Sequence, residues 1–233
     1  MRFGIISAGK GSRLASEGFG EPKPLVPING VPMIERLARI MMRCGADRIA
    51  VIVNADNPAV ADFVSGLARE LPIDLTVKST PTPMHSLMEL APNLGSDRFC
   101  VTTVDTVFRE SCFSSMMDEF AHTPYDGVMG VTQLVDDEKP LYVDVDDQMN
   151  ITAFRDRPWK DARYVSGGVY AMTDKAFPVL DDCIERGISR MRNFQRALVD
   201  AGLHLRAYSI DKIVDVDHAA DIATAEMFLR GGE

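Results

Sequence analysis

The residues best suited to chemistry lie in the first 25 positions of the chain. A short apolar run, 3–6, leads into Ser7-Ala8-Gly9-Lys10-Gly11-Ser12-Arg13, and Pro22-Lys23-Pro24-Leu25 follows after a short interval. Gly9 and Gly11 can adopt backbone angles that are closed to other residues, and they let backbone N–H groups approach a ligand closely. Such N–H groups near a helix start suit a phosphate chain. Arg13 and Lys23 would add positive charge beside it, Arg13 as a fork and Lys23 as a point charge.

Two better-known phosphate-binding loops do not match this stretch. A Walker loop needs Gly-Lys-Ser/Thr, but Lys10 precedes Gly11, and a dinucleotide fingerprint needs a third glycine where Leu14 stands. From the glycines alone, a plain strand-to-helix turn and a phosphate-binding loop are equally supported interpretations. The two cations, Arg13 and Lys23, favour a triphosphate site.

The two segments together resemble the signature of the sugar-phosphate nucleotidylyltransferases, enzymes with a GT-A-like nucleotidyltransferase fold. The matching residues stand in Ala8-Gly9-Lys10-Gly11-Ser12-Arg13 and Pro22-Lys23-Pro24-Leu25. The resemblance implies that Arg13 and Lys23 act in catalysis together with Asp105. It also implies a set of nucleotide-binding residues: Ala8, Gly9, Gly11, Ser12, Arg13, Lys23 and, from the loop that contacts the base in the family, Ser86. Ser7 departs from the family, which usually has a small or apolar residue there.

Three aspartates are candidate metal ligands. Asp105 follows the apolar run 99–104, where an aspartate is more often a turn or capping residue than a ligand of a hard cation. The resemblance implies instead that Asp105 holds Mg²⁺. The segment 213–222 resembles the closing segment of the family, with Asp215 in the place of the second metal ligand and Asp217 as a rival or additional one. We expect Asp217 to cap the last helix while Asp215 binds Mg²⁺.

The acceptor side of the resemblance rests on two positions. Arg157 stands where the family has the lysine that contacts a sugar phosphate, and Gly168 matches a glycine that lets the sugar lie against the backbone. A bulge in an edge strand would also explain Gly168. Asp144 and Asp146 spell the D-x-D of glycosyltransferases, but they adjoin a predicted hairpin and are expected in a solvent-exposed turn.

Composition places the chain among ordinary globular proteins. It has 233 residues, 46% of them hydrophobic, and a net charge of −9, which argues against a nucleic-acid partner. The four cysteines show no C-x-x-C spacing, as expected for small core residues in a reducing cytoplasm. Neither a signal peptide nor an apolar run of membrane-spanning length is present in the sequence. We therefore expect a cytoplasmic protein with no membrane partner.

The order of the expected elements defines the fold class. Buried strands are predicted at 3–6, 49–53, 73–77 and 99–104, alternating with helices at 32–44, 58–71 and 84–94. Strands dominate from residue 127 (127–134, 141–145, 151–154 and 164–172), and the chain closes with helices 174–186, 191–201 and 219–229 and strands 203–209 and 213–216. This predicts an α/β protein: a mainly parallel mixed sheet, Rossmann-like, with helices on both faces and a small β-rich acceptor-binding part. We expect one domain, 1–233, with a nucleotide-binding half (1–126) and an acceptor-binding half (127–233).

The reaction implied by the resemblance is transfer of a nucleoside monophosphate from a nucleoside triphosphate to a sugar 1-phosphate, with Mg²⁺ as cofactor and pyrophosphate as leaving group. Three alternatives stay open. The first is a cytidylyltransferase for a non-sugar phosphate of the phosphocholine or phosphonate type, or a molybdenum-cofactor nucleotidyltransferase. The others are a glycosyltransferase and a non-catalytic nucleotide sensor. The sequence does not predict the base or the sugar. It also leaves the oligomeric state open, so that a homo-oligomer is one possibility.

Overall fold

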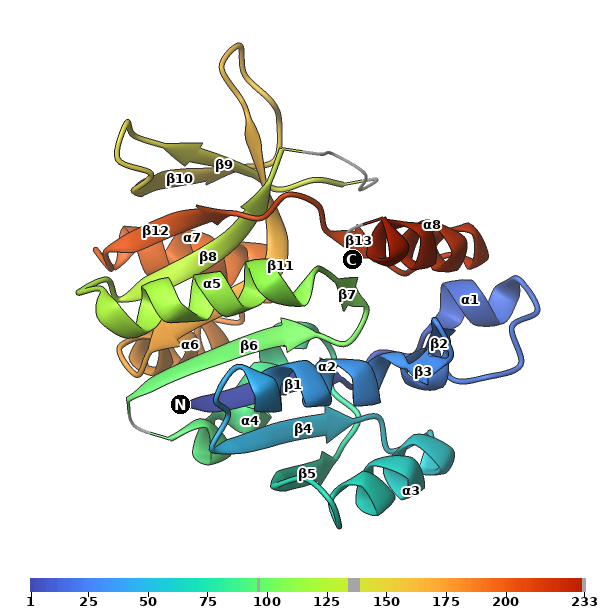
Figure 1. Ribbon diagram of the computed structural model, residues 1–233. Coiled ribbons are helices and arrows are strands. Elements are labelled where there is room, and N and C mark those ends of the chain that lie inside the picture. Colours follow the sequence, from blue (N-terminus) through green and yellow to red (C-terminus); the bar gives the residue numbers. More distant parts are fainter. Residues whose placement is uncertain (96, 134–138, 232–233) are drawn as a thin grey trace.

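The computed structural model describes residues 1–95, 97–133 and 139–231. A nine-stranded mixed sheet runs through it in the order β10-β9-β11-β6-β1-β4-β5, and β8 and β12 continue the sheet beside β11 (Figure 1). Its strands are β1 (Arg2–Ser7), β4 (Arg48–Val53), β5 (Ile73–Val77), β6 (Arg98–Thr103), β8 (Gly127–Thr132), β9 (Tyr142–Val145), β10 (Ile151–Arg155), β11 (Tyr164–Thr173) and β12 (Leu205–Ser209). Two small sheets pair β2 (Pro27–Ile28) with β3 (Val31–Pro32) and β7 (Thr106–Val107) with β13 (Val214–Asp215).

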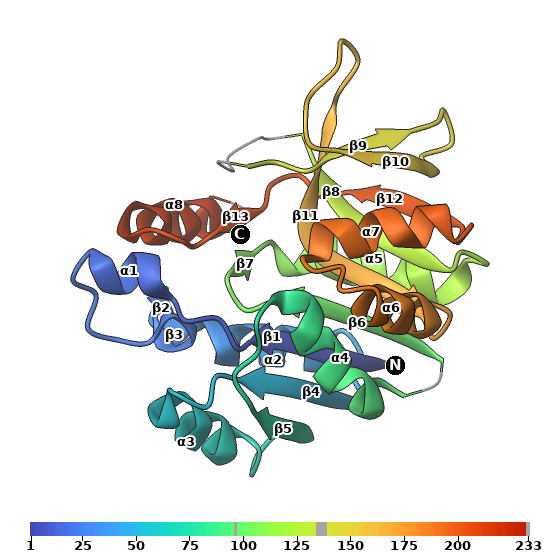
Figure 2. The same cartoon turned by 180° about the vertical axis from the view of Figure 1, so that it is seen from behind.

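Helices cover both faces of the large sheet, as the sequence predicts. They are α1 (Ser12–Ser16), α2 (Met33–Arg43), α3 (Pro58–Leu67), α4 (Pro83–Leu94), α5 (Glu110–His122), α6 (Ala176–Glu185), α7 (Met191–Asp200) and α8 (Ala219–Arg230). Along β1, Phe3 and Ile5 join a core with α2, α3 and α5, whereas Ile6 joins a second core with α4, α6 and α7. Figure 2 shows the α4, α6 and α7 side. Continuous apolar strands are expected where both faces are covered.

The parallel half of the sheet brings two loops to one edge. Strand β1 pairs in parallel with β6 and with β4, so β1 and β6 end side by side, at Ser7 and Thr103. Ligands of open α/β sheets bind beyond the carboxyl ends of such strands. The glycine-rich loop and Asp105 therefore leave the sheet at the same edge.

The end of the chain returns to this edge. Strand β13 pairs antiparallel with β7, which places Asp215 opposite Thr106, and α8 begins directly afterwards beside α1 (Figure 1). The carboxylate of Glu17 joins the two helices, because it accepts a 2.8 Å hydrogen bond from the backbone N–H of Ala219 and lies 2.6 Å from His218 Nδ1. Segments about 200 residues apart thus form one wall of the site.

Most predicted elements are confirmed, although the short strands β2, β3 and β7 were not predicted. Helix α3 stops at Leu67, short of the predicted residue 71, and β8 ends at Thr132, while the predicted end at residue 134 lies outside the described residues. Helix α5 was not predicted, although its buried residues Phe113, Met116, Met117 and Phe120 have helical spacing. Within the described residues, no helix has the length and hydropathy needed to span a membrane.

Candidate functional site

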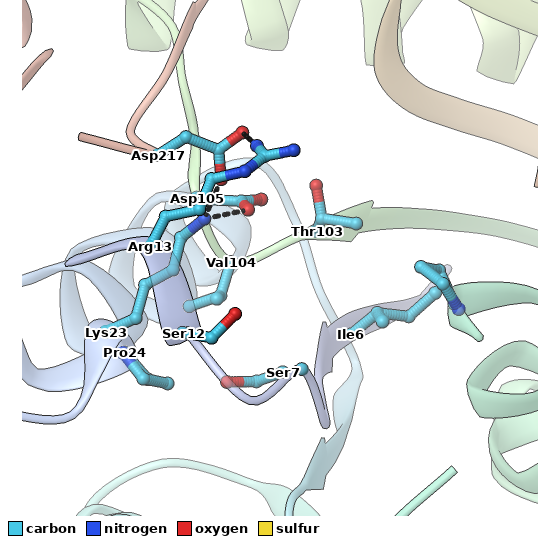
Figure 3. Close-up of a pocket in the computed structure, with 13 residues that line it drawn as sticks. Ile6, Ser7, Ser12, Arg13, Lys23, Pro24, Thr103, Val104, Asp105 and Asp217 are labelled. Carbon is cyan, nitrogen blue, oxygen red and sulfur yellow. Dashed lines mark hydrogen bonds and ion pairs between the residues drawn. The ribbon is translucent and has the colours of Figure 1, made fainter. Parts of the chain in front are cut away.

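Lys23 is the centre of the candidate site. Its side chain is only 12% exposed, and its Nζ donates hydrogen bonds to Asp105 Oδ2 at 2.6 Å and to Asp217 Oδ1 at 2.7 Å (Figure 3). Arg13, at the edge of the same cavity, forms an ion pair with the other oxygen of Asp217. Two cations from the N-terminal loop and two carboxylates from distant strands therefore converge at one point.

The charges of this cluster support one another. Burial alone would lower the pKa of Lys23, but Asp105 and Asp217 outweigh burial and raise the pKa of the ammonium above its ordinary value. Burial would likewise raise the pKa of Asp217, but the hydrogen bond from Lys23 and the charge of Arg13 hold it below its usual range. At neutral pH Lys23 is cationic and Asp217 anionic.

Gly11 allows the loop to fold against Lys23. It precedes α1 with φ +59°, in the left-handed region that favours glycine, and a Cβ at this position would lie 2.9 Å from the Cβ of Lys23. Gly9 has no such constraint, since a Cβ there would meet open space. The close approach of the glycine loop to the Pro-Lys-Pro segment therefore depends on Gly11.

The first of two adjoining cavities, about 300 Å³ in volume, lies over the glycine loop. Gly9, Gly11, Ser12, Arg13, Lys23 and Asp105 are among its lining residues, as expected for the nucleotide side. Ser7 also lines it, and its buried hydroxyl has no hydrogen-bond partner among the described residues. A bound polar ligand could satisfy this hydroxyl. The one sign of this role in the sequence is that Ser7 is polar and follows an apolar strand.

The end of β1 is held in place from a neighbouring strand. Asn54, which is buried and follows β4, donates a 2.8 Å hydrogen bond to the carbonyl of Ala8 and accepts one from Ser79. Ala8 itself is buried, so it contributes backbone rather than side chain to the loop. The start of the glycine loop is therefore fixed before any ligand binds.

The second cavity, about 370 Å³, shares Pro83, Thr103, Asp105 and Asp217 with the first. Gly168 lines it with φ +75°, and a Cβ there would lie 3.1 Å from Thr106 Oγ1. The register between β11 and β8 shifts between Ser166 and Tyr170, so the pairing is irregular at this point. However, β11 lies inside the sheet between β9 and β6, and the edge-strand explanation is wrong. The glycine exposes backbone to the cavity beside Asp105.

The structure corrects the roles that the sequence predicts for Asp215 and Asp217. Asp217 does not cap α8, because its carboxylate contacts Lys23 and Arg13. The N-cap residue is His218, whose backbone N–H donates a 2.6 Å hydrogen bond to Asp221. Asp215 lies in β13 and lines the second cavity. Asp217, rather than Asp215, therefore shares Lys23 with Asp105.

Two other predicted site residues lie elsewhere than expected. Ser86 is 1% exposed and its hydroxyl lies 2.6 Å from that of Thr80, so it is inside the protein and absent from the lining of both cavities. Arg157 is exposed in the loop after β10 and also lines neither cavity. Instead, Arg190 and Arg192 at the start of α7 line the second cavity. Sequence reasoning missed them because no motif marks them.

Asp146 follows β9 at the predicted hairpin turn, as expected, whereas Asp144 lies within β9 and not in a turn. The carboxylate of Asp146 accepts hydrogen bonds from the backbone N–H groups of Gln148 and Asn150, and Asp144 pairs with Arg155. Both carboxylates therefore serve the hairpin, and they offer no support for a glycosyltransferase metal motif.

The carboxylates at Lys23 fit a hard cation such as Mg²⁺ by donor type. Mg²⁺ in proteins usually has one or two carboxylate ligands and takes its remaining oxygens from substrate and water. Asp105 and Asp217 supply such a pair, since both lie within hydrogen-bond distance of one nitrogen. In the described part of the chain, no three His, Cys, Asp or Glu side chains converge as a metal site, so a set of Asp105, Asp215 and Asp217 is not preassembled.

Comparison with known proteins identifies the family. The profile of the MobA-like NTP transferase domain matches residues 4–197 of this chain. The chain belongs to this family. Its catalytic class, nucleotidyltransferase, agrees with the signature read from residues 8–25, and the matched range contains Arg13, Lys23 and Asp105.

Individual relatives are distant. The bifunctional protein GlmU of Methanococcus maripaludis is 21% identical over 95% of this chain, and the chain spans 52% of that protein. The D-glycero-alpha-D-manno-heptose 1-phosphate guanylyltransferase of Campylobacter jejuni is 21% identical over 74% of this chain and 76% of its own length. The 2-aminoethylphosphonate cytidylyltransferase of Lancefieldella rimae is 43% identical, but over only 21% of this chain and 20% of its own. The chain thus spans about half the length of the GlmU relatives it matches.

The fold is shared with a solved structure described as a putative glucose-1-phosphate thymidylyltransferase from Bacillus anthracis. The TM-score is 0.84 with 20% sequence identity, and the match covers 100% of this chain and 97% of the other. At this identity the comparison concerns the fold, which it confirms as the nucleotidyltransferase type predicted from the sequence.

Proposed function

We propose that this nucleotidyltransferase joins a nucleoside monophosphate to a sugar 1-phosphate and releases pyrophosphate. The observation that carries the proposal is the convergence of Lys23, Arg13, Asp105 and Asp217 between two adjoining cavities. One cavity contains the glycine loop suited to a triphosphate, and the other contains Gly168 and two arginines. Relatives and a structural neighbour named for heptose 1-phosphate and glucose-1-phosphate support the acceptor class.

In this reaction an oxygen of the acceptor phosphate attacks the α-phosphorus of the triphosphate. A new P–O bond forms, the bond between the α-phosphorus and its bridging oxygen breaks, and pyrophosphate leaves with that bond's electron pair. No protein nucleophile is required, because the acceptor phosphate is ionised at neutral pH. The work left to the protein is positioning and stabilisation of negative charge.

The role of each residue in this reaction follows from its position in the site. Backbone N–H groups of the loop 9–12 would hold the triphosphate, and Arg13 and Lys23 would offset the charge on its phosphates. Asp105 and Asp217 would hold Mg²⁺, and Asp215, which lines the second cavity, is a further candidate ligand. When bound there, Mg²⁺ would stabilise the charge that develops on the phosphate oxygens. Lys23 must then give up part of its contact with the two carboxylates and turn toward the phosphates.

We further propose that residues 1–126 carry the nucleotide and residues 127–233 the acceptor, and that the protein works in the cytoplasm. The division agrees with the cavity linings: Gly9 to Lys23 belong to the first cavity, and Ser166, Gly168 and the arginines of α7 to the second. Asp105 and Asp217 lie on the boundary and belong to both.

The test is pyrophosphate release from purified protein with Mg²⁺, each common nucleoside triphosphate and a panel of sugar 1-phosphates and non-sugar phosphates. Release with a sugar 1-phosphate is expected, and Asp105→Asn should lower the turnover at least 100-fold while the protein stays folded. Wild-type turnover in Asp105→Asn would remove Asp105 from the metal site. Lys23→Ala should also weaken triphosphate use more than Arg157→Ala does, and the reverse order would mean that the donor and acceptor sides are exchanged.

The panel also separates the remaining alternatives. Release with phosphocholine or a phosphonate, and with no sugar phosphate, would make the protein a cytidylyltransferase of the non-sugar type. Binding of a triphosphate without release from any acceptor would favour a sensor. Consumption of a nucleotide sugar without pyrophosphate would favour a glycosyltransferase, for which Asp144 and Asp146 give no structural support.

A further inference from the structure

Glu17 connects the helix that follows the glycine loop to the start of the last helix. It comes directly after α1, and its carboxylate reaches α8, where Oε1 lies 2.6 Å from His218 Nδ1 and Oε2 accepts a 2.8 Å hydrogen bond from the backbone N–H of Ala219. Figures 1 and 2 both show α1 beside α8. The contacted residues follow Asp217 directly, so Glu17 holds the segment that bears one of the two carboxylates at Lys23.

The backbone around Asp217 is fixed from three directions. The N–H of Val216 donates a 3.1 Å hydrogen bond to the carbonyl of Asp105, and the N–H of Asp217 donates one of 2.9 Å to Asp221 Oδ2. The first contact anchors the segment beside β7, and the second anchors it within α8. Glu17 supplies the third contact, which comes from the N-terminal loop. This contact therefore relates the position of Asp217 to that of α1.

Helix α1 depends on such contacts for its orientation. It has five residues, Ser12–Ser16, and a helix this short is not stable through its own hydrogen bonds. Leu14 is buried and Phe19 packs against the core, whereas Arg13 is exposed. Apolar contacts are non-directional, so they hold α1 to the core without fixing its rotation. Hydrogen bonds require a defined distance and direction, so Glu17 determines where α1 points Arg13.

The contact is favourable although the Glu17 side chain is 36% exposed. The hydrogen bond from the N–H of Ala219 and the one with His218 hold the pKa of Glu17 below its ordinary value, so the carboxylate is ionised at neutral pH. A carboxylate at the N-terminus of a helix is also stabilised by the helix dipole, and Ala219 is the first residue of α8. Glu17 is absent from the lining of both cavities, so it does not itself contact the substrates.

We propose that Glu17 is a positioning residue: it joins α1 to α8 and thereby holds Arg13 and Asp217 at a fixed distance from each other. The triphosphate, held through Arg13, and the metal, held through Asp217, then meet in one geometry. The inference rests on the proposed function, which assigns these two roles to Arg13 and Asp217.

The first test compares Glu17→Ala with Glu21→Ala. Glu21 is an exposed carboxylate of the same loop and is also absent from both cavity linings. Glu17→Ala should lower the turnover and raise the Mg²⁺ concentration for half-maximal activity, each about 10- to 100-fold, with the acceptor KM within about 2-fold of wild type, because a shift near 1 Å in a positioned group has effects of this size. Glu17→Gln should recover most of the loss, since its amide oxygen can still accept the N–H of Ala219.

A second variant changes the same contact from the side of α8. Ala219→Pro removes the N–H that Glu17 accepts, and proline suits this first helical position because the preceding His218 has an extended backbone, with φ −123° and ψ 161°. Ala219→Pro should reproduce part of the Glu17→Ala loss. The double variant should lose no more than Glu17→Ala alone, because both changes remove one interaction. Losses that multiply would show that the two residues act independently and would overturn the inference.

Hydrogen exchange of the metal-free protein tests the inference without any reaction. In Glu17→Ala the backbone amides of residues 13–19 and 217–221 should exchange about 10-fold faster than in wild type, while the central strands and the Glu21→Ala control stay unchanged. If no acceptor supports pyrophosphate release, the proposed function fails, and the exchange result alone judges the inference. Wild-type exchange in both segments would overturn it, as would a uniform rise across the sheet, which would indicate a general loss of stability. A wild-type Mg²⁺ requirement in an active Glu17→Ala protein would overturn it too.

Discussion

The ion-paired state of Lys23 can be tested through protein stability, independently of any reaction. The change is Lys23→Met, which keeps an unbranched side chain one atom shorter and removes its charge. Asp105 Oδ2 and Asp217 Oδ1 lie 2.6 and 2.7 Å from Lys23 Nζ, so these two oxygens are at most 5.3 Å apart. Without the ammonium, the two carboxylates repel each other across that distance.

The size of the effect follows from Coulomb's law and the exposure of the groups. Two unit charges about 5 Å apart repel by about 3 kcal/mol at an effective dielectric constant near 20, and by about 0.8 kcal/mol in bulk water. The Asp105 and Asp217 side chains are 25% and 37% exposed, so both estimates apply in part. We expect Lys23→Met to lower the free energy of unfolding by about 1–3 kcal/mol in the presence of a chelator.

The assay is urea unfolding at neutral pH with EDTA and with excess Mg²⁺, and the control is Lys10→Met. Lys10 is an exposed lysine of the same loop and lines neither of the two cavities. Mg²⁺ should restore Lys23→Met more than it stabilises wild type, because the metal can take the place of the lost ammonium between the carboxylates. The reasoning is refuted if Lys23→Met unfolds like Lys10→Met in EDTA, or if Mg²⁺ stabilises all three proteins equally.

Three further changes test other parts of the structure. Gly11→Ala should lower the free energy of unfolding by about 1–3 kcal/mol in urea unfolding, because the φ of +59° and the nearby Lys23 leave no room for a Cβ. An unchanged stability would mean that the loop does not lie against Lys23. Arg190→Gly should raise the melting temperature, because a φ of +77° strains a non-glycine residue by about 1–3 kcal/mol; a lower melting temperature would contradict this. Burial would raise the pKa of Asp126, but the ion pair with Lys175 and a hydrogen bond from a backbone N–H lower it. Asp126 should therefore stabilise the fold above a pH of about 4, and this stabilisation should be lost as the pH falls through its folded-state pKa. The stability difference between Asp126→Asn and wild type should therefore shrink in acid, and a constant difference from pH 7 to pH 3 would be the contrary result.

Local pattern was sufficient for most of the fold. Continuous apolar runs such as 49–53 and the helical spacing of Ile34, Leu37 and Met41 predicted elements that the structure contains. The rule that ligands bind beyond the carboxyl ends of parallel strands then predicts that the glycine loop and Asp105 lie at the same edge of the sheet. Helix α5 could also have been predicted from the sequence, because Phe113, Met116 and Phe120 have the same helical spacing.

The sequence by itself predicted that Gly11, Arg13 and Lys23 belong to one site, since they lie within 13 residues of one another, and all three line the first cavity. Only the tertiary structure decided which of the two closing aspartates contacts Lys23. Asp215 lies in β13 and Asp217 in the junction that follows, and the direction of this junction depends on the pairing of β13 with β7. It also decided which arginines reach the second cavity, because the start of α7 places Arg190 there and the loop after β10 leaves Arg157 outside it. Contacts between residues far apart in sequence depend on how the helices pack across the sheet, and residue type and spacing along the chain do not encode them.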